Sequence, residues 1–202
     1  MDKSQWLELM ARIGFDTNMN TYNELLSHYN QKHRHYHNTN HINAVLKHLV
    51  QSQYLANDYD ELEIALWFHD AIYKVFSATN ELDSANWAYK FLEDNGASKE
   101  CSTKVHSLIM ATRHNTIQID NDEKLIVDID LSILGSSQKT YHLFESWIRN
   151  EYKLIPNFIY KKKRKDILAN FLKRERIYCH NIFYEKLEVI ARANIENAIK
   201  NL

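Results

Sequence analysis

The stretch ELEIALWFHDAIYKV, residues 61–75, decides the fold, because its apolar residues recur three and four positions apart, as on one face of a helix. Within it, His69 and Asp70 place an imidazole beside a carboxylate. Neighbouring side chains on a helix diverge by about 100°, so the two groups cannot stack, but both can converge on one ion at their shared edge. Nitrogen and oxygen donors together suit Mn, Fe, Co, Ni or Zn. The competing interpretation of a lone helical histidine is a hydrogen-bonded core residue.

The rest of the chain continues this helical pattern. Only three glycines and one proline occur in 202 residues, so little interrupts the periodic segments. Further helices are predicted over residues 6–13, 22–29, 41–56, 80–95, 98–114, 125–134, 141–152, 158–174 and 181–201. The sequence therefore predicts an all-α helical bundle. Because linker composition and internal repeats are absent, we expect a single domain over residues 1–202.

Composition disfavours several classes of function. The chain has 25 Lys+Arg against 26 Asp+Glu, so we expect neither a nucleic-acid nor a membrane partner. The run KKKRK at 161–165 is typical of a solvated helix face. Cys101 and Cys179 lack CxxC spacing, which favours buried thiols in a reducing compartment. Residues 1–5, MDKSQ, carry no apolar signal region and no long apolar run follows, so we expect a cytoplasmic protein.

Eleven histidines are the unusual feature of the composition. Residues 32–40, KHRHYHNTN, contain three of them without core periodicity, which predicts a loop that brings side chains to a site. Asn40 suits the N-cap of the next helix, and this places His41 in its first turn beside the loop.

Two acids interrupt the most apolar segment of the chain. Residues 125–134, LIVDIDLSIL, are too apolar for a surface helix, yet they include Asp128 and Asp130. A buried carboxylate is costly unless a partner or a metal compensates it. One interpretation is a salt bridge to Arg34 or Arg113. The other is that one aspartate faces a functional site while its neighbour caps, pairs or meets solvent.

The order His41, His69-Asp70 and an aspartate about sixty residues further on resembles the H…HD…D signature of the HD superfamily of metal-dependent phosphohydrolases. The chain is also similar to one branch of bacterial predicted HD phosphohydrolases. The blocks that carry this likeness are RHYHN at 34–38, FHDAIY at 68–73, NE at 80–81, SA at 84–85, DIDLSILG at 128–135 and RNEY at 149–152.

The resemblance implies a helical HD fold in which His41, His69, Asp70 and Asp130 hold one divalent ion, be it Mn, Mg, Co, Ni, Fe or Zn. Asp128 is the alternative to Asp130. Such an ion leaves room for waters, and an acidified water is a nucleophile for phosphorus. The implied activity is hydrolysis of a phosphomonoester or phosphodiester in a nucleotide-like small molecule.

Three further residues are candidates for the reaction. Glu81 would orient or deprotonate the attacking water, or it is an acid that stabilises a helix N-terminus. His114 would be a further metal ligand or touch the substrate phosphate, or it is a histidine at a helix end. Arg34, in the loop with Tyr36 and His37, matches two phosphate oxygens at once, or it pairs with a buried acid.

One difference from the family pattern suggests an alternative function. Several HD nucleotidases carry a glutamate three residues after the HD aspartate, whereas this chain has Tyr73, so that glutamate's role cannot be transferred. The alternative is a non-catalytic, metal-containing module that binds a nucleotide or signalling ligand. A third possibility is oxygen chemistry at a di-iron centre, which would need His114. The substrate, the metal count and a homo-oligomeric state stay open.

Overall fold

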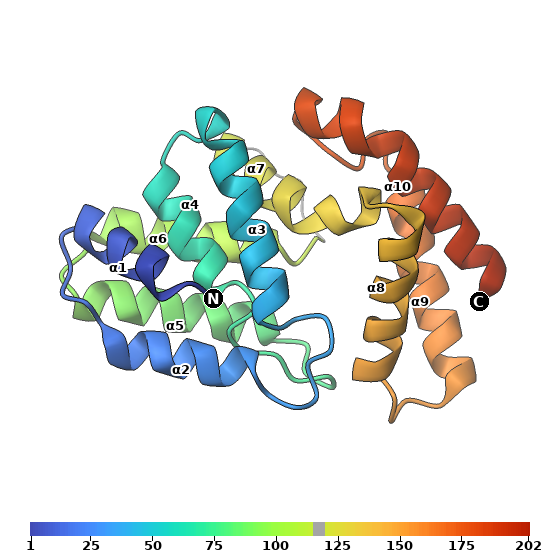
Figure 1. The fold of residues 1–202 in the computed structure, drawn as a ribbon, viewed down its shortest axis with the longest axis horizontal. Helices are drawn as coiled ribbons and strands as arrows, with labels where there is room; N and C mark the ends of the chain where they lie inside the picture. The colour runs from blue at the N-terminus through green and yellow to red at the C-terminus, as the bar shows by residue number, and fades with distance from the viewer. Residues whose placement is uncertain (115–119) are drawn as a thin grey trace. The chain divides into compact units, whose positions relative to one another are not determined.

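The computed structural model describes residues 1–114 and 120–202, and every regular element in these ranges is helical (Figure 1). The predicted all-α class is therefore confirmed. The chain forms two compact units, Met1–Ile126 and Val127–Leu202. In the described ranges, no helix combines the length and apolar character needed to cross a bilayer.

The first unit is built around one buried helix. Its elements are α1 (Lys3–Arg12), α2 (Met19–Tyr29), α3 (Thr39–Gln51), the 3-10 helix η1 (Gln53–Leu55), α4 (Tyr59–Phe68), α5 (Asn80–Asp94) and α6 (Lys99–Ala111). All side chains from Leu62 to Phe68 are buried, because α1, α3, α5 and α6 all contact α4. The Trp67 ring meets the Trp6 ring edge to face at 5.3 Å. This packing makes α4 a rigid support for the residues that follow it.

The end of α4 corrects the prediction of one helix over residues 61–75. The helix stops at Phe68, and His69 is its C-cap, so the His69-Asp70 pair lies in a turn. Tertiary hydrogen bonds take carbonyls of the last helical turn: Tyr29 Oη donates to Trp67 O at 3.0 Å, and the His69 ring bonds to Leu66 O at 2.9 Å. Carbonyls bound in this way compete with continuation of the helix.

Other boundaries differ by a few residues. Asn38, rather than Asn40, is the N-cap of α3, since its side chain accepts a hydrogen bond from the Asn40 amide at 2.8 Å. His41 still lies in the first turn of α3, as predicted. Helix α6 begins at Lys99, one residue after its predicted start, because Ser98 is its N-cap. The predicted thiol burial is wrong for Cys179, which is exposed in the segment before α10, where its backbone amide donates to Asp128; Cys101 is half-buried.

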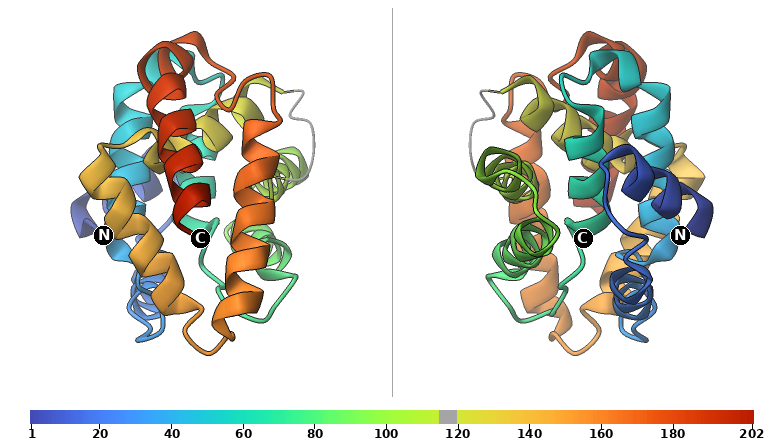
Figure 2. Two further views of the ribbon diagram at one scale, coloured as in Figure 1. Left: turned by 90° about the vertical axis from the view of Figure 1, so that its right-hand side faces the viewer. Right: turned by 90° about the vertical axis from the view of Figure 1, so that its left-hand side faces the viewer.

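The second unit packs three long helices together. Helix α7 (Asn121–Asp130) crosses into it and continues as the 3-10 helix η2 (Leu131–Gly135), followed by α8 (Gln138–Glu151), α9 (Asn157–Leu172) and α10 (Asn181–Asn201). Helix α10 contacts both α8 and α9 (Figure 2). A Cβ at Gly135 would lie 2.5 Å from Leu187 Cβ, so η2 meets α10 at a distance that only glycine allows.

Candidate metal centre

Three of the four predicted metal ligands converge in the first unit. His41 comes from the first turn of α3, and His69 and Asp70 come from the turn after α4. The Nε2 atoms of the two histidines are 3.0 Å apart. Asp70 Oδ2 lies 3.4 Å from His41 Nε2 and 3.3 Å from His69 Nε2. Two imidazole nitrogens and one carboxylate oxygen therefore face a common point.

The backbone fixes the protonation of His69. Its Nδ1 is 2.9 Å from Leu66 O, and a carbonyl can only accept, so Nδ1 carries the proton. The proton that Nε2 carries toward Asp70 is therefore the one that a bound cation would replace, and Nε2 would then direct its lone pair at that cation. Lone pairs and a carboxylate repel one another at these distances unless a proton or a cation lies among them. A histidine that donates its second nitrogen to a carbonyl is a common arrangement for a metal ligand.

Asp70 is ionised in this surrounding. Burial by itself raises the pKa of its carboxyl group. The charges of His69 and His37, together with hydrogen bonds from His41 and His69, outweigh burial and hold the pKa well below its ordinary value. The site therefore offers one formal negative charge and two imidazoles to a cation.

Arg34 braces the turn that carries the pair. Its guanidinium is buried and donates to Asp70 O at 2.6 Å, to Ala71 O at 2.8 Å and to His37 O at 3.1 Å. It also lies 5.6 Å from the centre of the Tyr73 ring. Arg34 thus ties the histidine loop to the turn after α4 through backbone carbonyls. Its expected contact with a substrate phosphate stays a prediction.

An aromatic wall adjoins the histidines. The ring of His37 stacks on Tyr73 with centroids 4.2 Å apart, and the ring of Tyr36 lies 4.8 Å from that of His41. The sequence places His37 in a functional loop but does not reveal that its charge acts on Asp70. Its position depends on the stack with Tyr73, which pattern alone cannot show.

The roles that the sequence suggests for Glu81 and His114 stay predictions. Glu81 is half-buried in the first turn of α5. That turn is tied to the segment after Asp70, because the Asn80 side chain accepts from Lys74 N at 3.0 Å and Ser84 Oγ accepts from Ile72 N at 2.9 Å. His114 follows α6 with φ 57°. The sequence predicts a turn or short extended link over residues 115–122; of these, 115–119 lie outside the described ranges, and 121–122 belong to α7.

In the second unit, the two aspartates of α7 have different surroundings. Asp128 is fully buried; its Oδ1 accepts from Cys179 N at 2.7 Å, and its Oδ2 accepts from His180 N at 2.7 Å and lies 2.8 Å from His180 Nδ1. Asp128 is thus hydrogen-bonded to the backbone at the start of α10, and it does not form the predicted salt bridge to an arginine. Asp130 is the half-buried last residue of α7. This difference favours Asp130 over Asp128 as the ligand, although its role stays a prediction.

Fold and site together define an all-α protein with a convergent His–His–Asp cluster. No protein-family model, curated protein or solved structure matches the chain.

Proposed function

We propose that this protein is a metal-dependent phosphohydrolase. The observation that carries the proposal is the convergence of His41, His69 and Asp70, with His69 Nε2 directed at the other two groups by Leu66 O. The donor set suits a divalent transition metal. We propose Asp130, from the second unit, as the fourth ligand. An ion at such a site supplies an acidified water for attack on a phosphoester.

The chain's own residues would orient the reaction. The Leu66 carbonyl keeps His69 in the tautomer that binds a cation, and Arg34 holds the turn of Asp70 in place. Several HD nucleotidases have a glutamate at the position of Tyr73. Tyr73 is buried and stacked on His37, so it forms part of the site wall and does not replace that glutamate as an acid or base. We propose Glu81 as the group that takes a proton from the attacking water. The substrate we propose is a small nucleotide-like phosphoester.

The test combines metal content with hydrolysis. Purified protein is expected to retain a divalent metal and to hydrolyse a chromogenic phosphoester with Mn, Co, Ni or Mg. His69→Ala and Asp70→Ala should lose both properties while circular dichroism stays unchanged. His106→Ala is the matched control, because His106 lies on α6, where its ring bonds to Asn86 at 3.3 Å and meets the Tyr89 ring at 6.3 Å, and is not a proposed ligand.

Three outcomes separate the candidates. Hydrolysis that survives both His69→Ala and Asp70→Ala would refute the metal-dependent mechanism. Metal binding without turnover across a broad panel of phosphoesters, but with tight nucleotide binding, would favour the non-catalytic module that Tyr73 suggests. Two irons in each chain, as measured by elemental analysis, would favour oxygen chemistry.

A further inference from the structure

The connection between α8 and α9 carries three large apolar side chains that face solvent. Leu154, in the turn, is 76% exposed, and Phe158 and Ile159, at the start of α9, are 75% and 40% exposed. Figure 1 shows this turn at one end of the helix pair α8 and α9. Single apolar residues on a surface need no explanation, but three so close together form a patch. We call these three residues the apolar tip.

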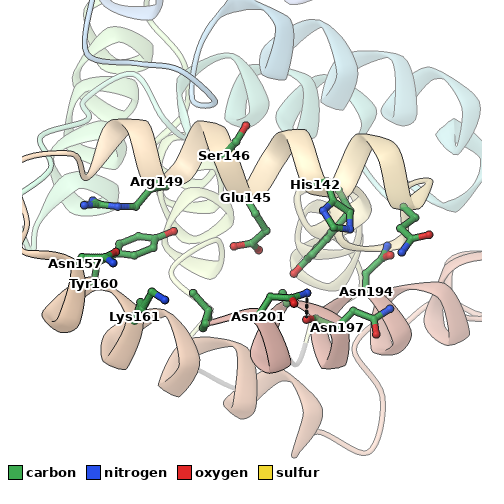
Figure 3. Close-up of a pocket in the computed structure, with 14 residues that line it drawn as sticks. His142, Glu145, Ser146, Arg149, Asn157, Tyr160, Lys161, Asn194, Asn197 and Asn201 are labelled. Carbon is green, nitrogen blue, oxygen red and sulfur yellow. Dashed lines mark hydrogen bonds between the residues drawn. The ribbon is translucent and has the colours of Figure 1, made fainter.

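The turn is held together by other residues. Arg149 donates to Tyr152 O at 2.6 Å and to Ile155 O at 3.1 Å, and its guanidinium lies 4.7 Å from the ring centre of Tyr160. Figure 3 shows Arg149, on α8, beside Tyr160, on α9. The Ile155 amide also donates to Tyr152 O at 2.9 Å. These bonds fix the turn without the side chains of the apolar tip, so the tip protrudes from a preorganised backbone.

Lysines flank the apolar tip. The exposed ones are Lys153, Lys162, Lys163 and Lys165. Residues 153–165 contain no acid, and Asp166 is the single acid in the sequence of α9. Because a helix rises 1.5 Å per residue, Lys162 lies about 6 Å along α9 from Phe158. The apolar tip and the positive charges therefore occupy successive levels of one surface.

The near-neutral balance of the whole chain, from which we expect no membrane partner, conceals an uneven distribution of charge. Residues 127–202 carry 14 Lys+Arg against 9 Asp+Glu, whereas residues 1–126 carry 11 against 17. The second unit is therefore basic by composition, and the KKKRK run at 161–165 is its longest run of like charge. The electrostatic complement of this region is an anionic surface.

A membrane that contains anionic lipids fits both features of the turn. Apolar side chains enter the boundary between headgroups and acyl chains to a depth of about 5–10 Å, and lysines at the level above them attract anionic headgroups. The spacing of Phe158 and Lys162 along α9 agrees with this depth. Leu154 and Ile159 are aliphatic and offer no ring on which a base could stack, so the tip suits lipid better than a nucleic acid.

We propose that the α8–α9 turn docks this protein on the surface of anionic phospholipid membranes, with the apolar tip entering the interface and the lysines of residues 153–165 binding the headgroups. Such peripheral contact requires no membrane-spanning helix. The proposal is independent of the proposed hydrolase, because residues 153–165 include none of the proposed metal ligands or catalytic residues.

Co-sedimentation of the full chain with lipid vesicles tests the proposal. Vesicles of phosphatidylcholine that contain roughly one-third phosphatidylglycerol should bind the chain at least tenfold more tightly than vesicles of phosphatidylcholine alone. High salt should weaken this binding, because it screens the lysines. Absence of binding to the anionic vesicles overturns the proposal. Binding to a single-stranded oligonucleotide in that case would assign the basic surface to a nucleic acid instead.

Variants of the turn separate its two contributions. Leu154→Ser combined with Phe158→Ser removes apolar surface and leaves the charge unchanged. Lys162→Gln combined with Lys163→Gln removes two charges and leaves the apolar tip intact. Each pair of substitutions should weaken binding to the anionic vesicles at least tenfold. All four side chains are exposed, so circular dichroism should stay unchanged.

Matched controls come from exposed positions of the second unit outside the turn. Val189→Ser is the control for the apolar pair, because Val189 is 79% exposed on α10. Lys139→Gln combined with Lys186→Gln removes the same charge from α8 and α10. Both controls, and His69→Ala in the metal centre, should bind the vesicles as tightly as the unmodified chain. Equal losses in the controls and in the variants of the turn would overturn the proposal.

Discussion

Asp128 and Asp130 show how two identical residues, two positions apart, acquire different roles. On a helix they point about 160° apart, so one side chain cannot share the environment of the other. Asp128 is enclosed and accepts hydrogen bonds from the backbone of Cys179 and His180. The sequence shows that buried acids need partners but leaves open which aspartate has which partner, because the partners come from a segment some fifty residues away.

Replacing Asp128 should therefore destabilise the fold. Asp128→Ala leaves the Cys179 and His180 amides and the His180 ring without their acceptor. We expect the free energy of unfolding in urea to fall by roughly 3 kcal/mol. Asp166→Ala, at an exposed position on α9, should change it by less than about 0.5 kcal/mol. An equally small change for Asp128→Ala would mean that its hydrogen bonds are not what holds the start of α10.

The two cysteines should differ in reactivity. Burial, and then the Glu61 carboxylate, raise the pKa of Cys101 to about 11, whereas Cys179 is exposed. Because the thiolate is the nucleophile, only roughly one Cys101 in a thousand is reactive at about pH 8. Peptide mapping after iodoacetamide treatment should show Cys179 labelled at least tenfold faster. Glu61→Gln should lower the pKa of Cys101 and speed its labelling, while unchanged labelling would contradict this electrostatic cause.

At the scale of elements, periodicity predicts the helices well and their ends less well. The range of α10 agrees with its prediction of residues 181–201. Helix α4 is shorter than predicted, since Tyr29 and the His69 ring bind the carbonyls of its last turn. Those bonds come from the tertiary structure. The predicted residues His41, His69 and Asp70 do meet, but the bracing by Arg34 was not foreseeable from spacing.

Arg34 should be irreplaceable in that bracing role. Lysine keeps the charge but cannot reach several carbonyls at once, as the guanidinium does at Asp70, Ala71 and His37. We expect Arg34→Lys to lower the free energy of unfolding by about 1–3 kcal/mol. Arg113→Lys is the matched control, because Arg113 is exposed and donates to Ala78 O at 3.3 Å. Equal effects of the two substitutions in urea unfolding would argue against a brace at Arg34.

At the scale of the whole molecule, helix α7 carries residues of both units. Asp122, near its start, accepts from the amides of Asn57 and Asp58 in the first unit, and Asp128 binds the chain before α10 in the second. Three of our proposed ligands, His41, His69 and Asp70, lie in the first unit. An ion bound by these three would therefore stabilise that unit, which makes up most of the chain.

Metal should accordingly raise the melting temperature of the full chain. A ligand that binds only the folded state stabilises by about 2.7 kcal/mol at a concentration one hundred times its Kd, which for a chain of this size is roughly 5–10 °C. We expect Mn²⁺ to raise the melting temperature in calorimetry, and a chelator to reverse the rise. The metal-induced rise in melting temperature should be small in His69→Ala and Asp130→Ala, and complete in His106→Ala.

Eleven histidines can bind metal weakly in the unfolded chain, and His106→Ala shares that background with His69→Ala. Equal shifts in these two variants would therefore place the stabilising metal away from the His41, His69 and Asp70 cluster.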